Sequence, residues 1–302
     1  MRIASLLPSL SELVCDLGRG DWLVGVTHEC DYPPPIARLP HLTRSKIDPA
    51  GTSAQIDAMV AEQGGSLYEL DRDLLESLQP DLILTQTQCD VCAVNEATVR
   101  KVAATLPNQP RVESVNPTDL SGVFEVFRRV GRLLDAEVEA ENLIGRFEST
   151  AREIARRRAG RPRPGTIMVE WTDPPFTSGH WNPELIELAG GRELLAQNGE
   201  ASRRTSWDAI MAAQPEVLLI APCGFELERV RQEVSPLARL DGWRSLPAVR
   251  QGMVTLADGS SYFARPGPRL EASLRIAAAA IDPETCSDLA PSSGWERLVV
   301  EV

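Results

Sequence analysis

The segment 118-TDLSGVFEVFRRVGRLLDAEVEAENLIGRFESTAREIARRR-158 decides the fold predicted for this chain. It contains no proline, and its apolar residues, among them Val123, Phe127, Ile144 and Phe147, recur at spacings of three and four. That spacing is typical of one face of a helix. At 1.5 Å per residue, one uninterrupted helix of this length would run roughly 60 Å.

The limits of this helix can also be predicted. Thr118 and Asp119 provide a start signal, the basic residues 156–158 suit a helix C-terminus, and Gly160 and Pro162 end the pattern. We therefore expect a rigid connecting helix, residues 118–160, between an N-terminal lobe, residues 1–117, and a C-terminal lobe, residues 161–302.

The two lobes are expected to be related copies. Residues 78–84, Leu-Gln-Pro-Asp-Leu-Ile-Leu, match residues 213–219, Ala-Gln-Pro-Glu-Val-Leu-Leu, each as a helix ended by proline and followed by a buried strand. A second match, residues 11–18 with 183–190, has a larger offset. The first lobe is therefore expected to carry an insertion, which we place within residues 33–67.

Short apolar runs alternate with helical patterns in both halves, which is typical of parallel sheets in an α/β protein. The predicted strands are residues 2–7, 23–26, 81–85, 111–115, 166–170, 216–221 and 252–256. Ligands of such sheets bind at the carboxyl ends of the strands. The loops to consider are therefore residues 28–35, 86–95, 171–182, 221–225 and 257–267.

Charge and hydropathy restrict the possible partners. The formal net charge is −12, which disfavours nucleic acid and anionic membranes. No run of 18 apolar residues predicts a membrane span, and the N-terminus lacks the apolar stretch of a secretory signal. The sequence as written predicts a cytoplasmic protein, or a periplasmic or cell-surface one if the start is trimmed or misannotated.

Several motifs in combination resemble one family. They are residues 171–179, Trp-Thr-Asp-Pro-Pro-Phe-Thr-Ser-Gly, the paired Gln-Pro-Asp/Glu strands, residues 31–34, Asp-Tyr-Pro-Pro, and residues 265–269, Arg-Pro-Gly-Pro-Arg. Together they resemble the class III substrate-binding proteins of ABC importers, and within them the vitamin B12-binding branch. The resemblance implies two Rossmann-like lobes joined by one long helix, with a corrinoid or metal chelate held between them. It also implies docking to an ABC permease through one acid on each lobe, here Asp73 and Asp208.

The candidate ligand-binding residues lie on the strand-end loops. Aromatic rings suit the flat face of a macrocycle, because stacking adds to the area they bury, and arginine suits a carboxylate or amide. The set is Glu29, Tyr32, Gln86, Trp171, Phe176, His180, Trp181, Tyr262, Phe263 and Arg265.

A second cluster combines thiols with an imidazole. Cys89 and Cys92 follow one predicted strand, and His28 and Cys30 follow another strand of the same sheet. Such a set suits Zn²⁺, an axial position of cobalt or iron, or a redox pair. Structural or incidental thiols are the alternative, since free cysteine often packs as a small apolar residue.

No nucleophile elbow, Walker loop or dinucleotide glycine fingerprint occurs in the sequence. We therefore expect no enzyme but a protein that binds cobalamin or a related corrinoid or tetrapyrrole, with His28, Cys30 or His180 as a possible ligand of its metal. The alternative is a cytosolic metal- or thiol-dependent protein that uses Cys30, Cys89, Cys92 and a histidine, with Zn or Fe, on the same scaffold.

Overall fold

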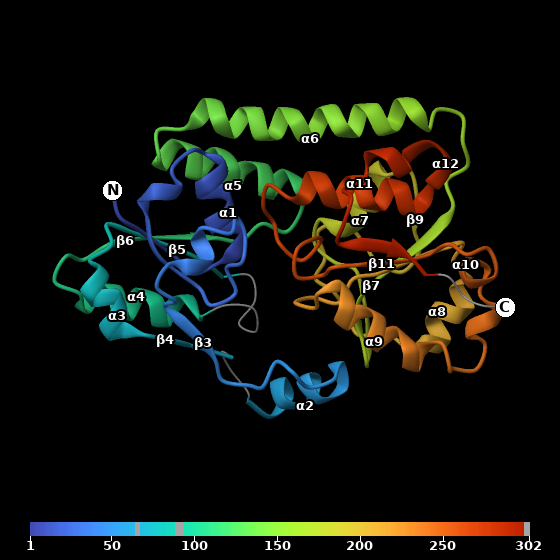
Figure 1. The fold of residues 1–302 in the computed structure, drawn as a ribbon, viewed down its shortest axis with the longest axis horizontal. Coiled ribbons are helices and arrows are strands. Elements are labelled where there is room, and N and C mark those ends of the chain that lie inside the picture. The colour runs from blue at the N-terminus through green and yellow to red at the C-terminus, as the bar shows by residue number, and fades with distance from the viewer. Residues whose placement is uncertain (64–66, 88–93, 299–302) are drawn as a thin grey trace. The chain divides into compact units, whose positions relative to one another are not determined.

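The computed structural model describes residues 1–63, 67–87 and 94–298. The chain forms two compact units (Figure 1). Unit 1 comprises Met1–Gly51, Gln55–Pro117 and Ser121–Ile144, and unit 2 comprises Thr52–Ala54, Thr118–Leu120 and Gly145–Val302. Each unit contains a sheet of its own.

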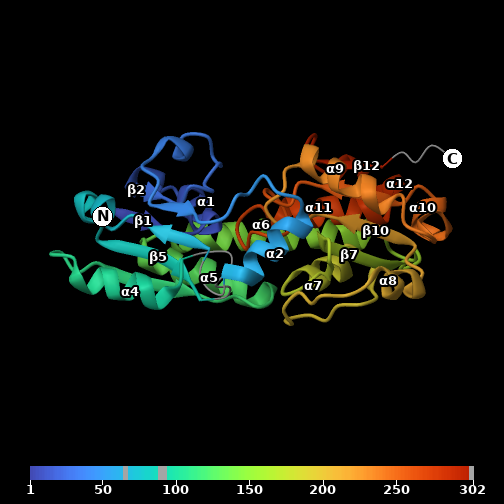
Figure 2. The same ribbon diagram turned by 90° about the horizontal axis from the view of Figure 1, so that it is seen from below.

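Unit 1 is built on a parallel four-stranded sheet in the order β2-β1-β5-β6. Its strands are β1 (Ile3–Ser5), β2 (Leu23–Val26), β5 (Leu82–Gln86) and β6 (Arg111–Val115). Strands β2, β1 and β5 lie side by side in Figure 2. All four strands predicted for this half are confirmed.

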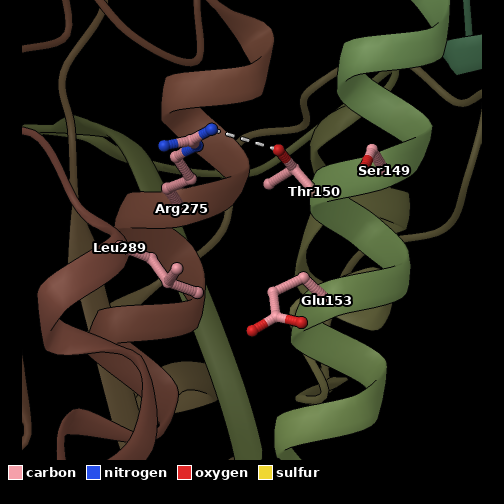
Figure 3. Close-up of a pocket in the computed structure, with 5 residues that line it drawn as sticks. All are labelled: Ser149, Thr150, Glu153, Arg275 and Leu289. Carbon is pink, nitrogen blue, oxygen red and sulfur yellow. Dashed lines mark hydrogen bonds between the residues drawn. The ribbon is translucent and has the colours of Figure 1, made fainter.

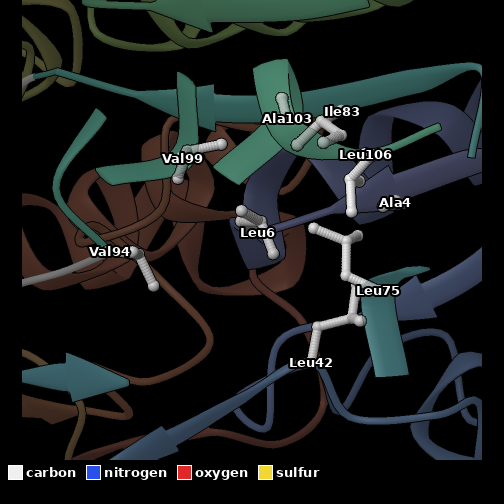
Figure 4. Packing of buried hydrophobic residues seen from close by; sticks show 9 residues of the cluster. All are labelled: Ala4, Leu6, Leu42, Leu75, Ile83, Val94, Val99, Ala103 and Leu106. Carbon is white, nitrogen blue, oxygen red and sulfur yellow. The ribbon is translucent and has the colours of Figure 1, made fainter. Parts of the chain in front are cut away.

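The helices of unit 1 enclose an apolar core. They include α1 (Pro8–Asp16), α3 (Arg72–Leu78) and α4 (Glu96–Thr105), and the short 3-10 helices are η1 (Gly20–Trp22) and η2 (Ile36–Arg38). Ala4 and Ile83 from the sheet pack with Leu75 of α3 and Val99 of α4 (Figure 4). These apolar side chains therefore form a core between the sheet and the helices of unit 1.

The stretch predicted as an insertion contains one strand of a small antiparallel sheet, and the second strand follows directly after it. Strand β3 (Thr43–Ser45) pairs with β4 (Tyr68–Leu70), with Thr43 opposite Leu70 and Ser45 opposite Tyr68. Helix α2 (Ser53–Gln63) follows β3 in the chain. No strand was predicted here, since three-residue strands with mixed polarity give no clear alternation.

Unit 2 is built on a second sheet, in the order β12-β11-β10-β7-β8, with β9 paired to β7. Its strands are β7 (Gly165–Thr172), β8 (Pro175–Thr177), β9 (Arg192–Glu193), β10 (Val217–Ile220), β11 (Val254–Ala257) and β12 (Trp295–Arg297). The pairs β7/β10 and β10/β11 are parallel, as predicted for the three long apolar runs. Strands β8 and β12, which were not predicted, add antiparallel edges.

The helices of unit 2 flank this sheet. They are α7 (Asn182–Leu188), α8 (Trp207–Ala213), α9 (Leu227–Leu237), α10 (Pro247–Arg250), α11 (Leu270–Ile281) and α12 (Pro283–Cys286), with 3-10 helices η3 (Trp243–Ser245) and η4 (Ser287–Leu289). Most residues of α11 are buried, and α11 contacts both α7 and strand β10. This helix is therefore central to the core of unit 2.

The expectation of one continuous helix over residues 118–160 is wrong. The segment forms two helices, α5 (Leu120–Leu133) and α6 (Glu137–Arg157). Asp135 between them has a left-handed φ of 49°, and Ala136 N donates to the Gly131 carbonyl oxygen at 2.9 Å. The spacing of apolar residues continues across this turn because both α5 and α6 bury an apolar face. Periodicity alone could therefore not show the break.

The two helices pack closely at the turn. A Cβ atom on Gly131 would lie 2.8 Å from Ala140 Cβ, and Arg128 Nε of α5 donates to Glu141 Oε1 of α6 at 2.7 Å. Helix α6 alone still has 21 residues, and it ends with Arg156 and Arg157 in its last turn, as predicted. The unit boundary at Ile144/Gly145 falls inside α6, so this helix contributes residues to both units.

The α/β class with parallel sheets is thus confirmed. Among the helices that the structure describes, none combines the length and apolar character that a membrane span requires.

Candidate functional site

In unit 1, the loop that follows β2 places His28 beside the insertion. His28 Nδ1 lies 2.7 Å from Thr43 Oγ1 of β3, and the imidazole ring lies 5.2 Å from the ring of Tyr68 on β4. Burial lowers the pKa of His28, an effect that the Glu29 carboxylate partly opposes. The ring is therefore oriented by two strands that the sequence analysis had not predicted.

Two further predicted residues lie nearby in the chain. Glu29 is exposed, and its Oε1 accepts a hydrogen bond from the Tyr68 hydroxyl at 2.6 Å. Tyr32 is 45% exposed, a large fraction for an aromatic ring. The structure therefore brings Glu29 together with the residues around His28 and leaves the Tyr32 ring open to solvent.

The predicted thiol cluster divides into two parts. Cys30 is buried, and its Sγ atom lies 3.1 Å from Ser11 Oγ of α1. Cys89 and Cys92 lie outside the described residues. In the part of the chain that the structure describes, no three His, Cys, Asp or Glu side chains gather where they could hold a metal ion. The four-ligand site therefore stays a prediction.

Gln86 ends strand β5, and its side chain is 6% exposed. Within residues 1–63, 67–87 and 94–298, its Nε2 atom has no hydrogen-bond partner. A buried donor without a partner costs about 1–3 kcal/mol. A ligand acceptor that met this amide would remove the cost, which supports the predicted role of Gln86.

In unit 2, Trp171 lies near the end of β7. Its ring packs 4.9 Å from the buried ring of Phe225, and the Arg229 guanidinium lies 3.6 Å from the centre of the Phe225 ring. The indole of Trp171 is half-buried. Its position is therefore set by an aromatic and cationic stack, while part of its surface stays accessible.

The Pro-Pro-Phe-Thr-Ser-Gly segment forms β8 and the turn after it. Phe176 of β8 is in register with Trp171, and Arg204 lies 5.8 Å from the centre of its ring. His180 adopts a left-handed φ of 55°, and its backbone N donates to the Glu200 carbonyl oxygen at 2.6 Å. Burial lowers the pKa of the His180 imidazole. Phe176 and His180 are both half-buried.

The side chains of Trp181 and Phe263 are buried inside unit 2 and do not lie on the surface of its loops. Their side chains are 4% and 1% exposed. Trp181 Nε1 donates to the Phe263 carbonyl oxygen at 2.7 Å, and Phe263 N donates to Ser273 Oγ of α11 at 3.0 Å. In this structure, neither ring offers a ligand more than a small part of its surface.

Tyr262 and Arg265 lie on the same loop as Phe263 and are half-buried. The Tyr262 ring covers Gly294, where a Cβ atom would lie 2.6 Å from Tyr262 Cε2. Arg265 Nη2 donates to Ser260 Oγ at 3.2 Å. Both side chains therefore have defined positions and keep some accessible surface.

Glu170 is a structural residue that the sequence analysis missed. Its Oε1 accepts from Gly179 N at 3.1 Å and from Asn182 Nδ2 at 2.5 Å, and its Oε2 accepts from the Ser202 hydroxyl. Burial raises the pKa of Glu170, while these hydrogen bonds act in the opposite direction. A single acid inside an apolar strand gives no sequence signal for such a role.

Asp73 and Asp208 occupy matching positions. Each is exposed and lies in the first turn of a seven-residue helix, α3 or α8. The N-cap of α3 is Asp71, which accepts from Leu74 N at 2.9 Å. The N-cap of α8 is Ser206, which accepts from Ala209 N at 3.1 Å. Each unit therefore presents an exposed acid in the first turn of a capped helix.

A pocket of about 220 Å³ in unit 2 lies apart from the predicted site residues (Figure 3). It lies between α6 and α11, with Arg275 donating to Thr150 Oγ1 at 3.3 Å. Ser149, Thr150, Glu153, Arg275 and Leu289 line it. Its lining contains no aromatic ring, so it does not suit a macrocycle.

Two α/β units, each with a largely parallel sheet, and one long helix that belongs to both define an α/β binding-protein architecture. The chain belongs to the periplasmic binding protein family, whose model matches residues 3–260. The predicted family resemblance and fold are thereby confirmed.

Relatives and solved structures agree with this assignment. An uncharacterized ABC transporter substrate-binding lipoprotein, YvrC, of Bacillus subtilis is 23% identical over 296 residues, covering 94% of this chain and 81% of the relative. A vitamin B12-binding protein of Yersinia pestis is 23% identical over 237 residues, covering 76% and 72%. A periplasmic heme-binding protein from Pseudomonas aeruginosa superposes with a TM-score of 0.71 at 22% identity, covering 94% and 93%.

Proposed function

We propose that this protein binds, without chemical conversion, cobalamin or a related corrinoid or tetrapyrrole through the carboxyl-end loops of its two sheets. The observation that carries the proposal is the set of half-buried aromatic rings on the loops of unit 2. Trp171, Phe176 and Tyr262 each keep accessible surface while protein contacts define their positions. Rigid rings of this kind bind a flat ligand with little loss of conformational entropy.

The family assignment supports the same proposal. Among the similar proteins, one is named a vitamin B12-binding protein and another a periplasmic heme-binding protein. Both ligands are large metal-containing macrocycles. Gln86 adds a buried amide without a partner in the described residues, and Arg265 adds a half-buried guanidinium, so polar groups at the ligand periphery would also find partners.

Equilibrium dialysis against cyanocobalamin, aquacobalamin, adenosylcobalamin and ferric heme tests the proposal. We expect at least one of them to bind with a Kd below ten micromolar. Replacing Trp171 with alanine should weaken binding about tenfold, since stacking and burial of one ring contribute on the order of 1–2 kcal/mol. Trp207→Ala is the matched control, because that indole packs against Trp243 and lies on α8. Binding of none of the four compounds would contradict the proposal.

We further propose that Asp73 and Asp208 dock the protein to an ABC permease. Both carboxylates are exposed at equivalent helix starts, where basic residues of a partner can reach them. The double charge reversal Asp73→Lys with Asp208→Lys should abolish stimulation of the reconstituted cognate importer's ATPase and leave the ligand Kd unchanged. Full stimulation by the double variant would contradict docking through these acids.

Location follows from the same proposal. One similar protein is named a lipoprotein and another a periplasmic protein. These relatives give no support to the expected cytoplasmic location, and delivery of a ligand to an importer would require the protein outside the cytoplasmic membrane.

A further inference from the structure

A single hydroxyl group in unit 1 orients His28. Thr43 Oγ1 lies 2.7 Å from His28 Nδ1 and also accepts a hydrogen bond from the His28 backbone N at 3.2 Å. Thr43 belongs to β3 and is 6% exposed. Because one oxygen contacts both the backbone and the ring, the side-chain torsions of His28 have little freedom.

One assignment of the hydrogen atoms around Thr43 leaves a lone pair on His28 Nε2. Its oxygen also lies 2.8 Å from Thr27 Oγ1, and the hydroxyl has only one hydrogen to donate. If Thr43 donates to Thr27, it accepts from His28 Nδ1–H, and His28 Nε2 then carries a lone pair. In the described part of the chain, Nε2 forms no hydrogen bond to another side chain.

Aromatic packing secures the plane of the ring. The Tyr68 ring lies 5.2 Å from the imidazole at an angle of 52°, and Tyr68 is itself held through its hydrogen bond to Glu29. A neutral imidazole whose second nitrogen is hydrogen-bonded is the arrangement in which histidine coordinates metals.

The other two candidate metal ligands, Cys30 and His180, are less well placed to coordinate a metal. Cys30 is buried, and its sulfur contacts Ser11 Oγ. His180 is held through its backbone, and across the described residues no hydrogen bond orients its ring nitrogens. Within the described residues, His28 alone of the three combines an oriented ring with a ring nitrogen that forms no side-chain hydrogen bond.

We propose that His28 Nε2 coordinates the metal of the bound chelate and that Thr43 is the positioning residue for this imidazole. The inference rests on the proposed function and specifies its ligands as chelates with an exchangeable axial position. With aquacobalamin, the bond between cobalt and water breaks, a cobalt–nitrogen bond forms and the water leaves, with no change in oxidation state. Cyanocobalamin, whose axial cyanide exchanges poorly, should gain nothing from His28.

Absorption titrations with aquacobalamin and cyanocobalamin test the coordination. The wild-type protein should bind aquacobalamin at least tenfold more tightly than cyanocobalamin. Binding should also shift the visible absorption bands of aquacobalamin. His28→Ala should lose both the spectral shift and the preference for aquacobalamin over cyanocobalamin. His41→Ala is the control, because that histidine is exposed and its Nε2 contacts the Ala37 carbonyl oxygen; this variant should retain the shift.

The positioning role has its own test. Thr43→Val removes the hydroxyl at similar volume and should weaken aquacobalamin binding by about tenfold, as loss of an outer hydrogen bond to a metal-bound histidine does. Thr43→Ser keeps the hydroxyl and should restore the spectral shift. Circular dichroism of both variants checks that β3 still forms.

The outcomes separate this inference from the proposed function. Equal binding of both cobalamins without a shift, a shift retained in His28→Ala, or a shift lost in His180→Ala instead would overturn the coordination by His28 and leave the function intact. A full shift in Thr43→Val would overturn the role of Thr43. Binding of neither cobalamin nor ferric heme would overturn the proposed function, and this inference with it.

Discussion

Gln79 and Gln214 close equivalent helices in the two units with nearly the same left-handed backbone, at φ 44° and 47°. Each follows a seven-residue helix and precedes a proline that leads into a buried strand. Each backbone N donates to the carbonyl oxygen three residues earlier, on Glu76 or Met211. The short repeat found in the sequence is therefore a repeat of backbone conformation.

This conformation leads to a prediction for β-branched substitutions. Gln79→Val and Gln214→Val should each lower the free energy of unfolding by about 1–2 kcal/mol, because valine tolerates a left-handed φ poorly. Glycine at either position should be close to neutral. Gln251→Val is the control, since Gln251 ends α10 at φ −95°. Urea denaturation checks the difference, and Val variants as stable as Gln251→Val would contradict it.

Two glycines in the α5–α6 segment give opposite predictions. Gly131→Ala should destabilise the protein by roughly 1–3 kcal/mol, because the new methyl group would lie 2.8 Å from Ala140 Cβ. Gly145→Ala should stabilise it by about 0.5–1 kcal/mol, because nothing lies within 4 Å of the added atom. Thermal unfolding of the two variants shows whether each substitution raises or lowers the stability of the protein. A single uninterrupted helix would give stabilisation in both.

The buried ion pair at the end of α6 predicts an acid-sensitive stability. Asp282 accepts from Arg158 Nε at 3.3 Å and from Arg161 Nη2 at 3.1 Å. Burial would raise the pKa of Asp282, but hydrogen bonds from Thr285, Arg161 and Arg158 outweigh it, and the pKa is lowered. The stabilisation is therefore fully present above the unfolded-state pKa of about 4 and is lost as pH falls through the lower folded value.

Asp282→Asn should cost roughly 3 kcal/mol at pH 7, because it leaves the buried Arg158 guanidinium without its charge partner. The same variant should show little further loss of stability between pH 5 and pH 3. Guanidinium denaturation at several pH values measures both. An Asn variant that keeps the wild-type acid dependence would show that other carboxyl groups control it.

Glu193 predicts a pH dependence of the opposite sign. Burial raises its pKa to about 7, against hydrogen bonds from Leu195 N, Leu194 N and Ser178 Oγ. A folded pKa above the unfolded value of about 4.3 means that stability falls as pH rises from about 4 to 7.

Glu193→Gln removes this titration and should be more stable than wild type at pH 8, by roughly 2 kcal/mol. At pH 4 the stabilities of the variant and the wild-type protein should differ little. Denaturation midpoints at pH 4, 6 and 8 give the comparison. A constant difference across this range would mean that Glu193 does not titrate in the folded protein.

The sequence predicted the regular elements well because their signals are local. All seven predicted strands are present. The break between α5 and α6 was missed because Gly131 and Asp135 act through close packing and a backbone angle. Neither interrupts the apolar period that marks the segment as helical.

The residue types of the candidate site were predicted from the sequence, but the burial of the individual side chains was not. Trp171, Phe176 and Tyr262 are half-buried, whereas Trp181 and Phe263, which look the same in sequence, are buried supports. Thr43 and Glu170 were missed because hydroxyl and carboxyl groups bond to loops distant in the chain. Such contacts depend on tertiary structure, which a single sequence does not show.

The most direct test of the binding function is the visible spectrum of the untagged protein after incubation with one equivalent of aquacobalamin, cyanocobalamin or ferric heme and removal of free ligand by gel filtration. The account predicts that at least one chromophore elutes with the protein at a stoichiometry near one, and that Trp171→Ala reduces the retained amount. A colourless protein peak with all three compounds would contradict it.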